Sequence, residues 1–386
     1  MSLFETHYKN IYQLLEYEDY PNLLKKIIDL ALDTEDLSYY KKTVYLLDWL
    51  ELNQTNIPEI RERFKILLDD LFAFLQKKGN RQGEKLLIVQ NLIKAYTQSY
   101  FALGPISFDI SEGEIVGLVG ENGNGKTTLL RSLCGELAPT NGKIDYLFEY
   151  KDNYDLRSQL IYIPQRTKDW HGTLLSNLQF TAASYGILGE ENENLVQLVI
   201  SRMGLRGYRN LNWNSLSSGY KMRFELARML LRKPKLLLID EPLANLDILA
   251  QQVVLDDFRD IAKSPFRPLG IVLSSQQLYE VEKTSDRVIF LKKGQPQNAD
   301  VKEGVAEFKE VAKFIVEFES DWSQEELRTV FSNLELETLQ IKGGTYIAIF
   351  PANISQERFL QVIVDNHIPL NYFRNISNST RRFFLS

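Results

Sequence analysis

The chain has 386 residues, enough for two or three domains, and its 44% apolar and 25% charged residues are typical of a globular protein. No stretch approaches the roughly eighteen uninterrupted apolar residues of a membrane span, and the first residues lack the basic-then-apolar order of a signal sequence. We therefore expect a cytosolic protein. The net charge of −6 argues against a nucleic-acid surface, and the single cysteine, Cys134, excludes intramolecular disulfides and thiolate zinc clusters.

Residues 1–80 predict an N-terminal all-α domain, because they are almost free of glycine and follow a helical period. The clearest helix has one apolar stripe, formed by Ile60, Phe64, Leu67, Leu68, Leu71 and Leu75. Pro58 stands where a helix start tolerates proline, and Gly79 stands where a helix end favours glycine. Three more helices are expected near residues 7–17, 21–32 and 36–52. The polar residues 77–83 are the first candidate linker.

Between about residues 86 and 298, strands and helices alternate, which predicts an α/β domain with a parallel or mixed sheet. Ligands of such sheets bind at the carboxyl ends of the strands. Cys134 falls in this region, and we expect it to be a small buried apolar residue rather than a reactive thiol.

A complete phosphate-binding loop runs from Gly120 to Thr128 and has the form G-x-x-x-x-G-K-S/T. An apolar strand at residues 114–119 precedes it and a helix follows, which is the context that the motif requires. Chance would produce this pattern in about one chain in a hundred of this length. The loop predicts contacts to a nucleotide from Gly120, Asn122, Gly123, Gly125, Lys126, Thr127 and Thr128. Lys126 should reach the β- and γ-phosphates, and the Thr127 hydroxyl should bind Mg²⁺.

A second apolar strand, at residues 235–241, ends in two acidic residues. A strand that is apolar on both faces belongs in the middle of a sheet, so its acids should emerge beside the phosphate loop. Asp240 is then placed to hold Mg²⁺, and Glu241 is placed to orient and deprotonate the attacking water.

Residues 216–230 begin Leu-Ser-Ser-Gly-Tyr, and Ser217 can cap the helix that starts there. This segment resembles the LSGGQ signature of the ATP-binding cassette (ABC) superfamily. It departs from the signature at Ser218 and Tyr220. The resemblance covers about residues 86–298 and implies ATP contacts from Ser217 and Gly219.

Three further positions match cassette motifs in the expected order. The resemblance implies that Tyr96 stacks on adenine, that Gln165 contacts Mg²⁺ and the lytic water, and that Asp247 belongs to the D-loop. A fourth motif departs from the pattern, because Gln276 stands where family members usually carry the H-switch histidine. The histidines of the chain are elsewhere, at His7, His171 and His367. An amide can donate a hydrogen bond to phosphate but cannot carry charge.

Residues 305–386 predict a separate accessory or regulatory domain. Strand and helix patterns follow the order β-α-β-β-α-β, which suggests a ferredoxin-like fold. A capping box at Ser323 and Glu326 opens its first helix, and Gly343-Gly344 separates two strands of a hairpin. The ending Thr380–Leu385 partly resembles the C-terminal extension of ABC-2-type ATPases.

The resemblance implies the ATP-hydrolysing subunit of an ABC exporter, since residues 173–187 are similar to ABC-2-type exporters. Such cassettes close head-to-tail on two ATP molecules, as homodimers or with a related cassette, so Lys126 and Asp240 would face Ser217 and Gly219 of the other copy. The membrane permease would be a separate chain, which places this one at the inner face of the cell membrane.

The permease should dock on residues 166–177, where Trp170 is either an anchor or a core residue. No nucleic-acid partner is expected. Two alternative functions stay open: a soluble ABC ATPase of translation or DNA repair, and a nucleotide-gated regulator with weak hydrolysis. Translation-type members carry two cassettes in one chain and repair-type members insert long coiled coils, and this sequence shows neither feature.

Overall fold

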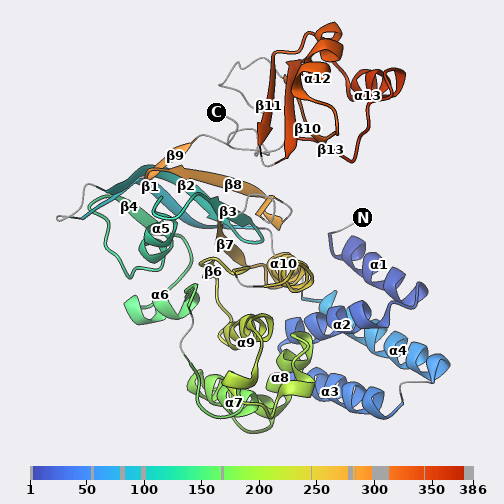
Figure 1. The fold of residues 1–386 in the computed structure, drawn as a ribbon. Helices are drawn as coiled ribbons and strands as arrows, with labels where there is room; N and C mark the ends of the chain where they lie inside the picture. The colour runs from blue at the N-terminus through green and yellow to red at the C-terminus, as the bar shows by residue number, and fades with distance from the viewer. Residues whose placement is uncertain are drawn as a thin grey trace. The chain divides into compact units, whose positions relative to one another are not determined.

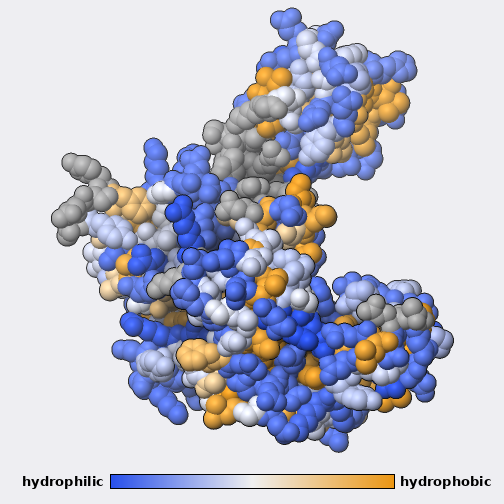
Figure 2. All heavy atoms as spheres, turned by 60° about the horizontal axis from the view of Figure 1, so that its bottom comes forward, coloured by the Kyte–Doolittle hydropathy of each residue, from blue (hydrophilic) through white to orange (hydrophobic). Residues whose placement is uncertain are grey.

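The structure is a computed structural model that describes residues 3–53, 56–78, 83–96, 101–166, 169–244, 246–276, 281–282, 284–297, 313–342 and 344–377. The chain divides into two compact units, Met1–Gln297 and Asn298–Ser386. Over the described ranges, no helix combines the length and the apolar character that a membrane crossing requires. On the face shown in Figure 2, apolar side chains are interrupted by hydrophilic ones.

The first unit begins with the helices predicted from the periodicity (Figure 1): α1 (Leu3–Glu16), α2 (Tyr20–Thr34), α3 (Leu37–Leu52) and α4 (Ile57–Leu75). Asp19 and Asp36 cap α2 and α3 by accepting hydrogen bonds from backbone N–H groups of the first turn. The predicted apolar stripe of α4 is buried along its whole length. Each predicted helix is therefore confirmed, with shifts of a few residues at the ends.

A six-stranded sheet forms the centre of this unit among the described residues, with the order β5-β6-β7-β3-β8-β9. Its strands are β3 (Ile115–Val119), β5 (Leu160–Ile163), β6 (Leu236–Ile239), β7 (Gly270–Ser275), β8 (Arg287–Lys292) and β9 (Gln295–Gln297). Neighbouring strands are parallel except β8 and β9. Every residue of β3, β6 and β7 is buried, as expected for strands that are apolar on both faces. The carboxyl ends of these strands carry the predicted nucleotide site.

A second, antiparallel sheet has the order β2-β1-β4 and was not predicted. It consists of β1 (Lys85–Ala95), β2 (Ala102–Ser111) and β4 (Asn141–Tyr146). Its apolar side chains, among them Leu87 and Ile106, share one core with Leu118 of β3 and Leu130 of α5 (Lys126–Leu133). Cys134 is buried at the end of α5, as predicted, and burial raises the pKa of its thiol to about 11.

Further helices of the first unit with bounds in the described residues are α6 (Asn153–Gln159), α7 (Leu174–Ser184), α8 (Gly189–Arg202), α9 (Ser218–Leu230) and α10 (Ile248–Ala262), with 3₁₀ turns η1 (Arg206–Tyr208) and η2 (Trp213–Ser215). In Figure 1, α7, α8 and α9 lie at the end of the unit away from the antiparallel sheet. Helices α2 and α3 pack against α8. The N-terminal helices therefore lie on the α/β region within one compact unit.

A buried arginine joins these helices to the α/β region. The side chain of Arg202, at the end of α8, is 0% exposed and donates hydrogen bonds to Asp29 of α2 and to Asp257 and Asp260 of α10. Burial alone would lower the pKa of Arg202, but the carboxylates of Asp29 and Asp257 outweigh it and raise the pKa. Lys26 of α2 also pairs with Asp260, at 2.5 Å.

The second unit follows the predicted order of elements: β10 (Lys313–Glu319), α12 (Gln324–Phe331), β11 (Thr338–Lys342), β12 (Thr345–Pro351), α13 (Gln356–Asp365) and β13 (Tyr372–Asn375), with a 3₁₀ turn η3 (Ser332–Leu334) after α12. Its antiparallel sheet has the order β11-β12-β10-β13 over a core rich in phenylalanine. The predicted capping box of Ser323 and Glu326 is present. Gly343 and the ending Thr380–Leu385 lie outside the described residues.

Candidate functional site

The phosphate loop connects β3 to α5, as the motif predicts. Gly123 and Gly125 have φ angles of +83° and +96°, in the left-handed region that glycine adopts without strain. A Cβ atom added at Gly123 would have no atom within 4 Å, so the space above this part of the loop is open. Asn122 is exposed beside Gly123, and Thr128 lies in the first turn of α5. The loop is thus shaped to let phosphate oxygens approach its backbone N–H groups.

Lys126 folds back over this loop. Its Nζ donates a hydrogen bond to the carbonyl oxygen of Gly120 at 2.7 Å and lies 3.1 Å from Oε1 of Glu241. The lysine side chain is 5% exposed and that of Glu241 is 10% exposed, so this ion pair is shielded from water on most sides. The predicted phosphate lysine and the predicted general base are therefore direct neighbours.

The two acids follow β6 at the carboxyl edge of the sheet, as predicted. The Thr127 hydroxyl donates a hydrogen bond to Oδ2 of Asp240 at 2.6 Å. A hydroxyl and a carboxylate are oxygen donors, which Mg²⁺ prefers. The predicted metal-binding pair thus lies together and fits this ion.

Two further hydroxyl groups of the described residues contact Asp240, and neither contact was predicted from the sequence. Ser274 of β7 donates to Oδ1 at 2.6 Å, and Tyr162 of β5 donates to Oδ2 at 3.3 Å. Burial and the charge of Asp240 raise the pKa of Tyr162. The sequence does contain a signal for Ser274: it is a polar residue that directly follows the apolar residues of a buried strand. Its neighbour Leu273 pairs with Ile239, immediately before Asp240.

Glu241 adopts an unusual backbone conformation, with a φ angle of +50°. Its Oε2 accepts a hydrogen bond from the backbone N–H of Gln276 at 3.3 Å. Its buried Oε1 has the charge of Lys126 beside it but no well-directed hydrogen bond in the described structure. The side chain of Gln276 is exposed at the end of β7. The predicted H-switch position is therefore next to the predicted base.

Gln165 and Tyr96 form fewer contacts with the other predicted site residues. Gln165 is exposed just beyond β5, the strand beside β6, and its side chain forms no hydrogen bond or ion pair within the described ranges. Tyr96 ends the β1 region with 39% of its surface exposed, and Nζ of Lys94 lies 5.5 Å from its ring centre. Their proposed contacts to nucleotide thus stay predictions.

The signature segment and the D-loop lie side by side. Ser217 caps α9 by accepting from the N–H of Tyr220 at 3.4 Å, and Asp247 caps α10 by accepting from the N–H of Ala250 at 2.8 Å. A Cβ atom at Gly219 would lie 3.5 Å from that of Ala250. In the described part of the chain, no hydrogen bond or ion pair joins Ser217, Gly219 or Asp247 to the phosphate loop.

Tyr220 stands where the signature motif has glutamine, and its side chain contacts Tyr208 of η1. Its hydroxyl bonds that of Tyr208 at 2.8 Å, and their ring centres are 4.1 Å apart. This departure from the motif therefore has an internal structural partner.

Trp170 was predicted to be either a docking anchor or a core residue. Its indole N–H donates to Oε1 of the buried Glu225 at 2.8 Å, and the guanidinium of Arg228 lies 4.5 Å from its ring centre. The ring also meets Phe224 edge-on at 6.1 Å. These contacts favour a structural role on the surface of α9.

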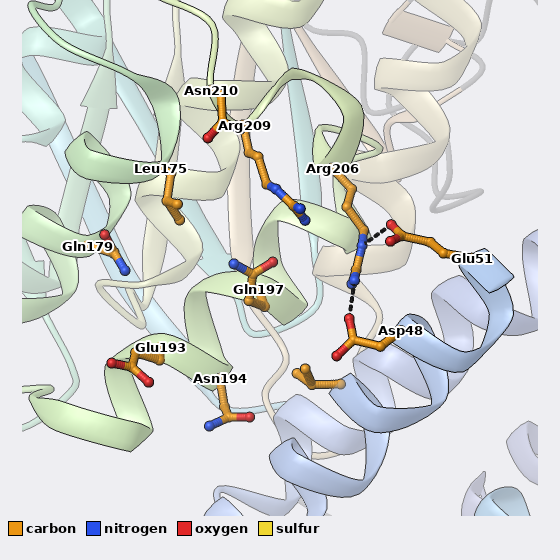
Figure 3. A pocket seen from close by; sticks show the side chains of 11 residues that line it. Asp48, Glu51, Leu175, Gln179, Glu193, Asn194, Gln197, Arg206, Arg209 and Asn210 are labelled. Atoms are coloured by element: carbon orange, nitrogen blue, oxygen red, sulfur yellow. Dashed lines mark hydrogen bonds and ion pairs between the residues drawn. The ribbon is translucent and has the colours of Figure 1, made fainter.

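A polar groove of about 620 Å³ lies apart from the phosphate loop, between α3, α7 and α8. In Figure 3, Arg206 reaches Asp48 and Glu51 of α3, with which it forms hydrogen-bonded ion pairs. Arg209 points toward Gln197 in the same view. The groove shares no residue with the site around Asp240 and Glu241, so we assign it no part in nucleotide chemistry.

Comparisons with known proteins agree with this site. A family model described as "ABC transporter" matches residues 103–244. The chain is 33% identical over 213 residues to the uncharacterized ABC transporter ATP-binding protein YxlF of Bacillus subtilis, which covers 54% of this chain and 69% of that protein. It is 29% identical to the phosphonates import ATP-binding protein PhnC of Treponema denticola, covering 54% of this chain and 87% of that protein.

Among solved structures, the fold resembles the ATP-binding cassette MJ0796, a dimer in a post-hydrolysis state bound to ADP and Pi. The TM-score is 0.50 at 22% identity, covering 56% of this chain and 100% of that one. The family model's match, residues 103–244, contains the phosphate loop and both acids of the site. The chain therefore belongs to the ABC transporter family, as an ATP-binding subunit of the ABC superfamily of ATPases.

Proposed function

We propose that this chain binds ATP with Mg²⁺ and hydrolyses it, with Glu241 as the general base, to drive a separate membrane subunit. The observation that carries the proposal is the meeting of the phosphate loop with the acid pair. Lys126 lies 3.1 Å from Glu241, and Thr127 lies 2.6 Å from Asp240. One compact edge of the sheet thus holds a phosphate cradle, a metal-binding pair and a base.

Within this proposal, Thr127 and Asp240 would hold Mg²⁺, joined by Gln165 from the end of β5. The ion, when bound, neutralises charge on the phosphates. The loop N–H groups and Lys126 bind the phosphate oxygens, and Tyr96 stacks on the adenine. Glu241 then accepts the proton of the attacking water, and Gln276 and Gln165 orient that water.

We further propose that two cassettes pair head-to-tail around ATP, as a homodimer or with a related cassette. At the start of α9, Ser217 is exposed and Gly219 is half-buried, and Asp247 is exposed nearby. Since these residues form no hydrogen bond to their own phosphate loop in the described structure, a second copy can receive them. The similar cassette MJ0796 is a dimer with ADP and Pi, which supports this arrangement.

The membrane subunit would dock on residues 166–177, which leave the Gln165 turn and run into α7. Leu175 belongs to this segment and also lines the polar groove, so the docking surface extends toward α3. Trp170 is poorly suited as the docking anchor, because its indole N–H already donates a hydrogen bond to Glu225. Docking of this kind would hold the chain at the inner face of the cell membrane.

Export stays a prediction that depends on the resemblance of residues 173–187. The relatives include a phosphonates import protein, so they do not favour export. The comparisons likewise leave open which cargo is moved.

For residues 305–386 we propose a ferredoxin-like accessory domain that biases cassette closure without touching ATP. The strand order β11-β12-β10-β13 supports this fold. We treat residues 1–80 as a helical addition to the cassette at residues 86–298. Truncation at about residue 300 should leave ATP binding by the monomer near normal while it alters dimerisation or turnover. Loss of ATP binding in a folded truncation would contradict this division.

A second candidate function is a nucleotide-gated regulator that barely hydrolyses ATP. Gln276 favours it, because an uncharged amide replaces the usual histidine beside Glu241. The test is phosphate release by the purified full chain with Mg²⁺-ATP, alone and with any membrane chain that co-purifies from detergent extract. Slow but measurable turnover supports the ATPase. Binding without turnover, even with the membrane chain present, supports the regulator.

A further inference from the structure

One buried hydroxyl group contacts both acids of the site. Ser274 is 0% exposed, and its Oγ lies 2.6 Å from Oδ1 of Asp240 and 2.9 Å from the backbone nitrogen of Glu241. A serine hydroxyl has one donor and two acceptor positions. The carboxylate can only accept and the N–H can only donate, so the direction of both hydrogen bonds is fixed.

The hydrogen bond to Asp240 fixes the rotation of its carboxylate. Asp240 is 4% exposed, and Oδ1 of its carboxylate accepts the hydrogen bond from Ser274. The other oxygen, Oδ2, is left facing Thr127 at 2.6 Å and Tyr162 at 3.3 Å. Thr127 is the predicted Mg²⁺ ligand. The hydroxyl groups of Ser274 and Tyr162 therefore keep Oδ2 of Asp240 turned toward the predicted metal position.

The hydrogen bond from Glu241 supports a strained turn. A φ angle of +50° is uncommon for a residue other than glycine and persists where surrounding contacts enforce it. Ser274 accepts the N–H of this residue, and the turn directs the Glu241 carboxylate toward Lys126 and the N–H of Gln276. A change at Ser274 should therefore move the base as well as the metal-binding acid.

We propose that Ser274 is a positioning residue for both Asp240 and Glu241, and that Tyr162 is a positioning residue for Asp240 alone. This inference rests on the Mg²⁺-dependent ATP hydrolysis proposed above. It predicts different effects for the two residues. Substitution of either one should weaken the Mg²⁺-dependent affinity for ATP, whereas only substitution of Ser274 should lower the turnover number.

The experiment uses full-length Ser274→Ala and Tyr162→Phe, with Ser132→Ala as the matched control. Ser132 is also a buried serine, but its hydroxyl donates to the backbone oxygen of Thr128. ATP affinity is measured with Mg²⁺ and again with EDTA, followed by turnover at saturating Mg²⁺. Folding is checked by circular dichroism.

Ser274→Ala should weaken Mg²⁺-dependent ATP affinity about tenfold, or about 1.4 kcal/mol, and leave the affinity in EDTA unchanged. Its turnover number should fall at least about tenfold even at saturating Mg²⁺. Tyr162→Phe should weaken the Mg²⁺ response about two- to threefold with normal turnover, because its 3.3 Å contact is longer. Ser132→Ala should match wild type in both assays.

Equal loss of affinity in Mg²⁺ and in EDTA, or no loss, for a folded Ser274→Ala would overturn the inference. If that variant does not fold, Tyr162→Phe decides: an unchanged Mg²⁺ response overturns the shared positioning of Asp240, and a shifted response supports it. A wild-type chain that binds no Mg²⁺-ATP would instead overturn the proposed function. The two failures are thereby distinguishable.

Discussion

Lys126 and Glu241 form an ion pair across the nucleotide site, with Nζ 3.1 Å from Oε1. The lysine comes from the phosphate loop and the glutamate from the end of β6. Because Lys126 is the predicted phosphate ligand, bound ATP would compete with Glu241 for its ammonium group. Binding of nucleotide would thus release the base on which hydrolysis is proposed to depend.

Lys126→Ala should remove most of the affinity for Mg²⁺-ATP while the protein stays folded. A hydrogen bond to a charged group contributes about 1.5–3 kcal/mol, so the dissociation constant should rise roughly 10- to 150-fold. Isothermal titration calorimetry measures this change, with Lys143→Ala as the control, since Lys143 is an exposed lysine paired with Asp145. Normal ATP affinity in Lys126→Ala would remove this lysine from the site.

Arg202→Ala should destabilise the first unit strongly. The substitution leaves the carboxylates of Asp29, Asp257 and Asp260 without their shared guanidinium, and breaking a buried ion pair costs about 3–5 kcal/mol. Urea unfolding gives the free energy of unfolding. Arg259→Ala is the control, because its pair with Asp256 is exposed and should contribute well under about 1 kcal/mol. Similar losses in both variants would argue against the network around Arg202.

Trp170→Ala should lower the free energy of unfolding by about 2 kcal/mol, less than the roughly 3–5 kcal/mol of a fully buried tryptophan. The ring is half-buried, and Glu225 keeps Arg228 as a partner when the indole N–H is lost. Thermal unfolding measures the effect against Tyr154→Ala, which alters an 84% exposed side chain. An unchanged melting temperature for Trp170→Ala would return this residue to the docking surface.

The parts of the fold that the sequence predicts are those whose signal is local. The α4 stripe, the capping box at Ser323 and the loop around Lys126 each depend on neighbours within a few residues, and all are confirmed. The placing of Asp240 beside the loop follows from its position at the end of a buried strand.

The features that the sequence did not predict depend on contacts between distant segments. The periodicity of a strand does not say which sheet it joins, so the antiparallel β2-β1-β4 sheet was missed. The contact of Ser274 with Asp240 requires the register of β6 against β7. The packing of α2 on α8 through Arg202 joins residues 173 positions apart, and no local pattern marks that pairing.

The most direct test of the proposed hydrolysis is the ATP turnover of Glu241→Gln against wild type. The amide keeps an oxygen that can accept from Gln276 but cannot take a proton from water, so turnover should fall about 10²–10⁴-fold. ATP should still bind, and the variant should accumulate as an ATP-bound dimer in size-exclusion chromatography. Gln276→His, measured beside it, should change turnover modestly or raise it. Wild-type turnover in Glu241→Gln would contradict the assignment of Glu241 as the base.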